Sequence, residues 1–376
     1  MNFLFACGGT AGHINPALAI AAELRRRIPN AEILFVGADR EMEKRLIPPA
    51  GYELVNIKMS GLKRGFSPSD LLYNIKTFRN LTAAGKKTAK IIEEFKPQAV
   101  IGTGGYICYP VLKKGARMGI PTFVHESNAV PGLTTMLLSS IVDRVLVSFP
   151  GIEKNYRCPD RVVFTGTPVR LGFEAEEQNF IKKESNKKPL VLSFWGSLGA
   201  EHMNETIADF IKLNVNSREF NHIHATGKSN GVAEMKARLK QIGVPDDLPP
   251  GMEIREYIDD MQSVMEQADI VLCRAGGSTV AELTVMGKPA VLIPSPYVSN
   301  NEQEKNAEQL LKAGGAVMLK EKNCSGEVLY NIVTDILRND NKLKNMLEAQ
   351  KALGVPKAAQ GIADLIITFV TRNEGG

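Results

Sequence analysis

The chain has 376 residues, 44% of them hydrophobic, so it is long enough to bury sizeable cores, and its length favours two domains over one. It lacks the charged start of a signal peptide and the roughly 20 apolar residues of a membrane span, and its five scattered cysteines show no metal-ligand spacing, which favours a reduced cytoplasmic protein. A formal net charge of +5 suits an anionic substrate or surface without requiring a nucleic acid.

The first predicted elements are a strand at Asn2–Ala6, a glycine loop at residues 8–13 and a helix from about Pro16 to Arg27. The glycines are spaced G-G-x-x-G and not G-x-G-x-x-G, so we do not expect a nicotinamide-binding domain, although Asp39 follows the next predicted strand as a ribose-binding acid would. His13 lies where the loop meets the helix. An imidazole there can act as a base or bind an anion, but histidines at such places also simply cap or pack.

Between Met59 and Pro97 the sequence predicts an apolar ridge surrounded by cations. The ridge residues are Leu71, Leu72, Ile75 and Phe78, and the basic residues are Lys63, Arg64, Lys76, Arg79, Lys86, Lys87 and Lys90. On its own the pattern favours an ordinary amphipathic core helix with a solvated basic face. The density of lysine and arginine also keeps open a role at an anionic membrane surface.

Strands and helices then alternate, with strands predicted at residues 99–101, 122–125, 144–147 and 162–164. This rhythm is typical of a parallel, doubly wound sheet, which binds ligands at the carboxyl ends of its strands. His125, Glu126, Asn128 and the turn from Gly102 to Tyr106 follow such strands. For most of these residues the alternative is buried packing within a turn.

After a polar stretch from Glu174 to Pro189 the pattern begins again with a strand at 190–193 and a glycine loop at 195–200. A later strand, Asp269–Arg274, runs into Gly276-Gly277 and a helix, where free N–H groups would form an anion site. Thr279-x-x-Glu282 fits either a capping box or a ligand role. Gln303 and Asn306 share one face of the next helix, either as a solvated face or as part of the site.

The last predicted elements are a strand at about Ala316–Leu319 and a helical tail from Pro356 to Val370. The tail spaces its apolar residues for burial, and these residues are Ile362, Leu365, Ile366 and Phe369. We expect this tail to pack on another surface of the chain, such as the first domain.

Seven motifs occur in one order along nearly the whole chain. They are Gly8-Gly-Thr-Ala-Gly-His13, Gly102-Thr-Gly-Gly-Tyr106, His125-Glu-Ser-Asn-Ala-Val-Pro-Gly132, Thr165-Gly-Thr-Pro-Val-Arg170, Gly196-Ser-Leu-Gly-Ala200, Tyr257-Ile-Asp-Asp-Met261 and Arg274-Ala-Gly-Gly-Ser-Thr-Val-Ala-Glu282. The set closely resembles the MurG family, the UDP-GlcNAc:undecaprenyl-diphospho-muramoyl-pentapeptide N-acetylglucosaminyltransferases of bacterial peptidoglycan synthesis.

The resemblance implies an α/β fold of GT-B architecture, with two doubly wound parallel-sheet (Rossmann-like) domains facing across a cleft. We expect an N-terminal acceptor- and membrane-facing domain at residues 1–167, joined by a C-terminal helix at 354–376, and a UDP-GlcNAc-binding domain at 168–353. The enzyme would be attached peripherally to the cytoplasmic face of the cell membrane. Its partners would be UDP-GlcNAc, the lipid-linked acceptor and an anionic membrane surface, with no nucleic acid.

By motif match, the resemblance implies catalytic roles for His13 and Glu126, with His13 the better candidate for the base. The substrate-binding residues would be Thr10, Ala11, Gly12, Tyr106, Asn128, Arg170, Ser197, Ile258, Gly277, Ser278, Thr279, Val280, Ala281, Glu282, Gln303 and Asn306. Among them Glu282 would hold the ribose diol and Ile258 the uracil edge. The chain departs from the family pattern at Ala11, Trp195 and Leu198.

The implied reaction is a metal-independent hexosyl transfer without a cofactor. A hydroxyl of the acceptor's muramic sugar attacks C1 of GlcNAc, UDP leaves, and the configuration inverts. Loop N–H groups, a helix dipole and Arg170 can offset the charge on UDP, in keeping with the lack of an Asp-x-Asp triplet in the sequence. The alternative is a UDP-GlcNAc 2-epimerase, which shares the fold and the nucleotide but needs no acceptor.

Overall fold

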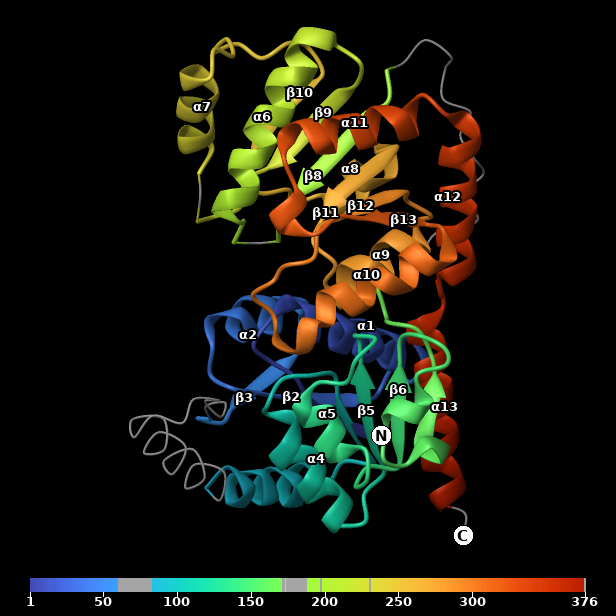
Figure 1. Cartoon of the computed structure of the whole chain (residues 1–376). Coiled ribbons are helices and arrows are strands. Elements are labelled where there is room, and N and C mark those ends of the chain that lie inside the picture. The colour runs from blue at the N-terminus through green and yellow to red at the C-terminus, as the bar shows by residue number, and fades with distance from the viewer. Residues whose placement is uncertain (60–82, 171–172, 174–187, 197, 230, 375–376) are drawn as a thin grey trace, which may run out of the picture. The chain divides into compact units, whose positions relative to one another are not determined.

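The computed structural model describes residues 1–59, 83–170, 173, 188–196, 198–229 and 231–374, and these residues form two compact units (Figure 1). The first unit contains Met1–Leu171 and Val355–Gly376, and the second contains Gly172–Gly354. The boundaries expected from the sequence lie within four residues of these. Most of the apolar and basic ridge between Met59 and Pro97 lies outside the described residues. The same is true of Ser197.

The first unit is built on a parallel sheet of seven strands in the order β3-β2-β1-β4-β5-β6-β7. The strands are β1 (Asn2–Ala6), β2 (Glu32–Gly37), β3 (Glu53–Asn56), β4 (Ala99–Gly102), β5 (Thr122–Glu126), β6 (Arg144–Val147) and β7 (Val162–Phe164). The helices are α1 (Ala11–Arg27), α2 (Glu41–Leu46), α4 (Cys108–Arg117), α5 (Leu133–Leu138), α13 (Ala358–Glu374) and a helix over residues 83–95. The strand order reverses between β1 and β4, which is where a doubly wound sheet opens a crevice for ligands.

The first helix begins earlier than the sequence suggested. It starts at Ala11 and includes Pro16, whereas the prediction began at about Pro16. Here the proline lies one turn further in, and the helix continues through it. The consequence is that His13 belongs to the first turn of α1 and not to the loop before it.

The tail helix α13 completes the core of the first unit by packing against α1. Four of its buried side chains, Ile362, Ala363, Ile366 and Val370, join a cluster with Phe3, Phe5 and Ile20. Among the described residues, one stretch, Asp340–Arg372, is apolar and long enough by composition to cross a membrane. The structure divides this stretch into two helices, and core packing accounts for the apolar face of the second.

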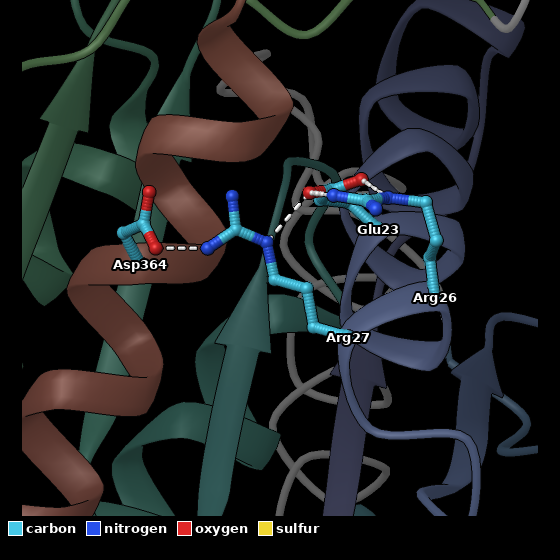
Figure 2. Close-up of polar contacts among 4 residues, drawn as sticks. All are labelled: Glu23, Arg26, Arg27 and Asp364. Atoms are coloured by element: carbon cyan, nitrogen blue, oxygen red, sulfur yellow. Dashed lines mark hydrogen bonds and ion pairs between the residues drawn. The ribbon is translucent and has the colours of Figure 1, made fainter.

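Charged side chains also join α13 to α1 (Figure 2). Arg27 donates to Glu23 at 2.6 Å and also donates to Asp364 on α13, while Arg26 donates to the other Glu23 oxygen at 2.8 Å. The hydrogen bond from Arg26 is the main reason that the pKa of Glu23 is lowered. Glu23 is nearly buried, so the two arginines compensate for a carboxylate that would otherwise be poorly solvated.

The second unit is built on a parallel sheet of six strands in the order β10-β9-β8-β11-β12-β13. The strands are β8 (Leu190–Phe194), β9 (Asn221–Ala225), β10 (Met252–Arg255), β11 (Ile270–Cys273), β12 (Ala290–Leu292) and β13 (Ala316–Met318). The helices are α6 (Glu201–Ser217), α7 (Val232–Gln241), α8 (Met261–Gln267), α9 (Gly277–Val285), α10 (Glu302–Ala313), α11 (Gly326–Leu337) and α12 (Asp340–Leu353). The order again reverses at the first strand of the unit, between β8 and β11.

A chain of buried polar side chains joins β8, β9 and α6 in this unit. Asn204 donates its amide to the Thr226 carbonyl, so its Oδ1 accepts from Nε2 of His224 at 3.2 Å. His224 Nδ1 therefore accepts from Ser193 at 2.7 Å, and Ser193 Oγ accepts from His222 Nε2 at 2.8 Å. Each of these hydrogen bonds therefore has a fixed donor and a fixed acceptor, and both imidazoles are neutral.

The two buried histidines in this series of hydrogen bonds make the stability of the second unit sensitive to acid. Burial lowers the pKa of His224 to about 3 and that of His222 well below its usual value. Because the unfolded chain binds these protons near pH 6.5 and the folded chain does not, stability is full above that pH and falls as the pH drops toward 3. Each histidine should contribute a loss of up to about 1.4 kcal/mol per pH unit in this window.

The test is denaturant unfolding between pH 7 and 5, followed by fluorescence of Trp195, the single tryptophan, which lies in the core of this unit. Glutamine in place of His222 should make the loss of stability with falling pH shallower. The control is His202→Gln, since His202 is exposed on α6. Equal slopes in all three proteins would contradict the prediction.

Candidate active site

His13 is held in one orientation and one tautomer by the loop after β1. Its Nδ1 lies 2.9 Å from the carbonyl oxygen of Gly8. A carbonyl can only accept, so Nδ1 carries the proton and Nε2 keeps its lone pair. Thr103, after β4, donates its hydroxyl to the His13 carbonyl at 2.7 Å and fixes the backbone of the same residue. The half-buried imidazole is therefore arranged to accept a proton at Nε2.

Two glycines after β4 allow the turn after β4 to pack closely against the turn after β1, at the point where the strand order reverses. A Cβ atom on Gly104 would lie 2.3 Å from the His13 ring, and one on Gly105 would lie 2.5 Å from the Gly8 carbonyl oxygen. Both glycines also have positive φ angles, 126° and 86°. The motif Gly102–Tyr106 thus serves to bring backbone against His13. Tyr106 itself has the Arg40 guanidinium 5.3 Å from its ring centroid.

Glu126, at the end of β5, is held in place by hydrogen bonds to both of its carboxylate oxygens. One carboxylate oxygen accepts from the backbone and side-chain amides of Asn128, both at 3.1 Å. The other accepts from the N–H of Gly132 at 3.0 Å and from the hydroxyl of Thr135 at 2.7 Å. These four hydrogen bonds tie the buried carboxylate to the loop that carries Asn128, and its role as the reserve base stays a prediction.

His125 also proves to be structural. It is almost fully buried on β5, where its Nε2 donates to the Gly166 carbonyl at 3.0 Å and burial lowers its pKa. The remaining predicted positions of the first unit lie at or near the surface. Thr10 is exposed and caps α1 without a side-chain hydrogen bond, and the half-buried residues are Ala11, Gly12, Asn128 and Arg170.

In the second unit, α9 begins at Gly277, directly after the switch-point strand β11. Its N-cap is Gly276, which has no side chain to satisfy the first N–H groups of the helix. Thr279 is therefore the third residue of the helix and Glu282 the sixth, so the capping-box interpretation of this pair was wrong. Such a helix start suits an anion, as predicted. Ser278 and Thr279 are half-buried in this turn, and Glu282 is 6% exposed.

The two amide side chains predicted on α10 both make hydrogen bonds to the backbone of loops that follow strands of this sheet. Asn306 is fully buried and donates to the Ala275 carbonyl at 3.0 Å, so it fixes the turn before α9 and we withdraw its assignment as a ligand contact. Gln303 is half-buried, and its carbonyl oxygen accepts from the N–H of Ser295 at 2.9 Å. That bond leaves the donor side of the Gln303 amide available for a ligand.

The loop after β8 contains two of the departures from the family pattern. Leu198 is 66% exposed, whereas Trp195 is buried in the core. The Arg274 guanidinium lies 5.9 Å from the Trp195 ring centroid and pairs with Glu321 at 2.6 Å. This ion pair could not be predicted from the sequence, because its partners are 47 residues apart. Ile258 is buried, so a contact from it would come from its backbone.

Two sheets of the same winding, each with a glycine turn and a helix start at its switch point, define a two-domain nucleotide-binding enzyme of GT-B architecture. The glycosyltransferase family 28 N-terminal domain matches residues 3–147, and the family 28 C-terminal domain matches residues 190–362. The chain belongs to this family, within the MurG group of N-acetylglucosamine transferases. The predicted fold class, family and transferase activity are confirmed.

Full-length relatives support this membership. A UDP-N-acetylglucosamine–N-acetylmuramyl-(pentapeptide) pyrophosphoryl-undecaprenol N-acetylglucosamine transferase of Acetivibrio thermocellus is 43% identical, and the match covers 100% of both chains. The crystal structure of Acinetobacter baumannii MurG matches with a TM-score of 0.74 and 26% identity, over 98% of this chain and 100% of that one.

The epimerase alternative has weaker support. A UDP-GlcNAc 2-epimerase from Neisseria meningitidis matches with a TM-score of 0.68 at 15% identity, over 98% of this chain and 100% of that one. A likeness at that identity reflects the shared fold alone.

Proposed function

We propose that this enzyme transfers N-acetylglucosamine from UDP-GlcNAc to the muramic sugar of undecaprenyl-diphospho-muramoyl-pentapeptide, converting lipid I to lipid II with inversion. The name of the Acetivibrio thermocellus relative specifies the same sugar and an acceptor of the same kind. The proposed chemistry rests on one observation, the contact of His13 Nδ1 with the Gly8 carbonyl, which leaves Nε2 unprotonated.

In the proposed reaction His13 acts as the general base. A muramic-sugar hydroxyl gives its proton to Nε2 as its oxygen bonds to C1 of GlcNAc, and the bond from C1 to the UDP oxygen breaks. A single displacement needs one base. Glu126 acts indirectly, by holding Asn128 at the edge of the sheet.

The second unit would stabilise the leaving group. UDP gains negative charge as it departs, and the uncapped N-terminus of α9 offers N–H groups and the positive end of a helix dipole. Glu282 would accept hydrogen bonds from the ribose hydroxyls, and Gln303 would donate from its free amide side. Arg170, in the first unit, would add a positive charge.

Product analysis with labelled UDP-GlcNAc tests this function. With lipid-linked muramoyl-pentapeptide present, the label should move to the lipid fraction and UDP should be released in equal amount. Without the acceptor, UDP-GlcNAc should remain unchanged. Conversion of UDP-GlcNAc alone to its 2-epimer would instead support the epimerase.

We also propose that the enzyme binds the membrane surface peripherally, because its acceptor carries a long lipid chain. The support is the sequence pattern of the ridge together with the adjoining helix over residues 83–95, in which Lys86, Lys87 and Lys90 are exposed. Each basic residue near an anionic leaflet contributes about 1 kcal/mol, and apolar burial adds a part that salt does not screen.

Co-sedimentation with anionic and neutral vesicles checks this prediction. Serine in place of Ile75 and Phe78 should reduce binding, and glutamine in place of Lys76, Arg79 and Lys86 should abolish the preference for anionic vesicles. A matched control removes three exposed lysines of the second unit, Lys236, Lys312 and Lys322. If the ridge variants lose stability while the molecules that remain folded bind vesicles normally, the ridge belongs to the hydrophobic core, and the membrane-binding surface lies elsewhere.

A further inference from the structure

Glu43, on the short helix α2, is a fully buried carboxylate placed under the loop that holds His13. Its Oε1 accepts a hydrogen bond from the N–H of Gly9 at 3.1 Å. Among the described residues, its other oxygen has no hydrogen-bond partner. A buried carboxylate is costly to keep, so a residue in this position calls for a role beyond packing.

The hydrogen bonds connect Glu43 to His13 through a single peptide group. The carbonyl of Gly8 and the N–H of Gly9 belong to the same planar unit. Glu43 accepts from the N–H of that unit, and His13 donates from Nδ1 to its carbonyl oxygen at 2.9 Å. A carboxylate on one side polarises the peptide, which strengthens the hydrogen bond that His13 makes on the other side.

The packing around this peptide fits Glu43 closely. A Cβ atom on Gly8 would lie 2.3 Å from Glu43 Oε1, and one on Gly37, at the end of β2, would lie 3.2 Å from the Glu43 side chain. Other ionisable groups in electrostatic contact with the pair include the buried Cys7 and the exposed Lys44 beside Glu43, and the buried His125 beside His13. Among these groups, Glu43 is the one that bonds the peptide.

We propose that Glu43 is a positioning residue for the transfer reaction, which acts through the Gly8–Gly9 peptide to hold His13 as the Nδ1–H tautomer with Nε2 ready to accept a proton. This inference rests on the proposed role of His13 as the base. It differs from a carboxylate that touches the imidazole directly, because here a backbone amide lies between the two side chains.

Kinetics of Glu43→Ala and Glu43→Gln give the first test. Alanine removes the acceptor of the Gly9 N–H, and kcat should fall about 10- to 100-fold, the range found when the hydrogen-bond partner of a metal-binding histidine is removed. The KM for UDP-GlcNAc should change little. Glutamine keeps an acceptor oxygen without the charge, so it should recover part of the loss. The matched control is Glu41→Ala, an exposed carboxylate on the same helix.

Nitrogen-15 NMR of the imidazole rings gives a test that does not depend on activity. The chain has five histidines, and His13→Asn identifies the resonances of His13. In the parent protein the ring should be the Nδ1–H tautomer, and in Glu43→Ala the Nε2–H form should become populated. An unchanged tautomer with unchanged kcat would overturn the proposal. A changed tautomer in an enzyme that tolerates His13→Ala would show that Glu43 sets the tautomer but would refute His13 as the base, and with it the role of Glu43 in the transfer reaction.

Gly8→Ala tests the same contact from the other side. Its Cβ would meet only the Glu43 carboxylate within 3.5 Å, so the variant should displace Glu43 and lose kcat as Glu43→Ala does. The double variant should be no worse than Glu43→Ala alone, because both changes break one interaction. Independent, multiplying losses would count against the proposal.

Discussion

His13→Ala should lower kcat by about 100-fold or more while leaving the affinity for UDP nearly unchanged. The reason is that the substitution removes the lone pair at Nε2, which the contact of Nδ1 with the Gly8 carbonyl leaves unprotonated. Binding of the nucleotide is assigned mainly to the second unit and should not depend on this ring. Turnover with saturating substrates and calorimetric titration of UDP give the two quantities.

The control for this experiment is His202→Ala, since His202 is exposed on α6 and contacts neither candidate site. It should retain full turnover. Near-normal turnover in His13→Ala would remove His13 as the base. If Glu126→Gln then proved inactive but folded, the role would return to Glu126 despite its four hydrogen bonds.

The second large effect is expected at the helix start in the other unit. Glu282→Ala should weaken UDP binding by roughly 2–4 kcal/mol, because two hydrogen bonds from an ionised carboxylate to the ribose diol are lost. The fold should remain intact, since Glu282 is the sixth residue of α9 and does not cap it.

Calorimetric titration of UDP and a melting curve on the same variant separate the two roles of Glu282. A capping residue would cost roughly 0.5–2 kcal/mol of stability and leave UDP affinity unchanged. Glu234→Ala, an exposed carboxylate near the start of α7, is the control for removing a helix carboxylate. Unchanged affinity in Glu282→Ala would exclude the ribose role.

Much of the fold could be predicted because the central strands are buried on both faces and appear as short apolar runs. The strands β1, β4, β8 and β11 are of this kind. The strands without a prediction are β3, β9 and β10. The edge strands β3 and β10 carry charged residues, and β9 reads Asn-His-Ile-His-Ala, whose histidines are buried only because Ser193 and Asn204 satisfy them.

Some features of the candidate site could be predicted from the sequence and others could not. Glycine turns and helix starts have local signatures, so the loops around His13 and Gly277 could be placed from the sequence. Roles set by distant partners could not. Asn306 bonds a carbonyl 31 residues away, and Glu43 bonds an amide 34 residues away, and neither contact leaves a pattern in the residues around it.

The membership of α13 in the first unit has a consequence for synthesis of the chain. The buried side chains Ile362, Ala363, Ile366 and Val370 complete a core whose other members come from residues 3–146. On the ribosome, that core stays open while residues 172–354 emerge, and these residues already contain every strand of the second sheet. The second unit can therefore fold first, reversing the usual N-terminal-first order, and the first unit closes only after α13 has left the exit tunnel.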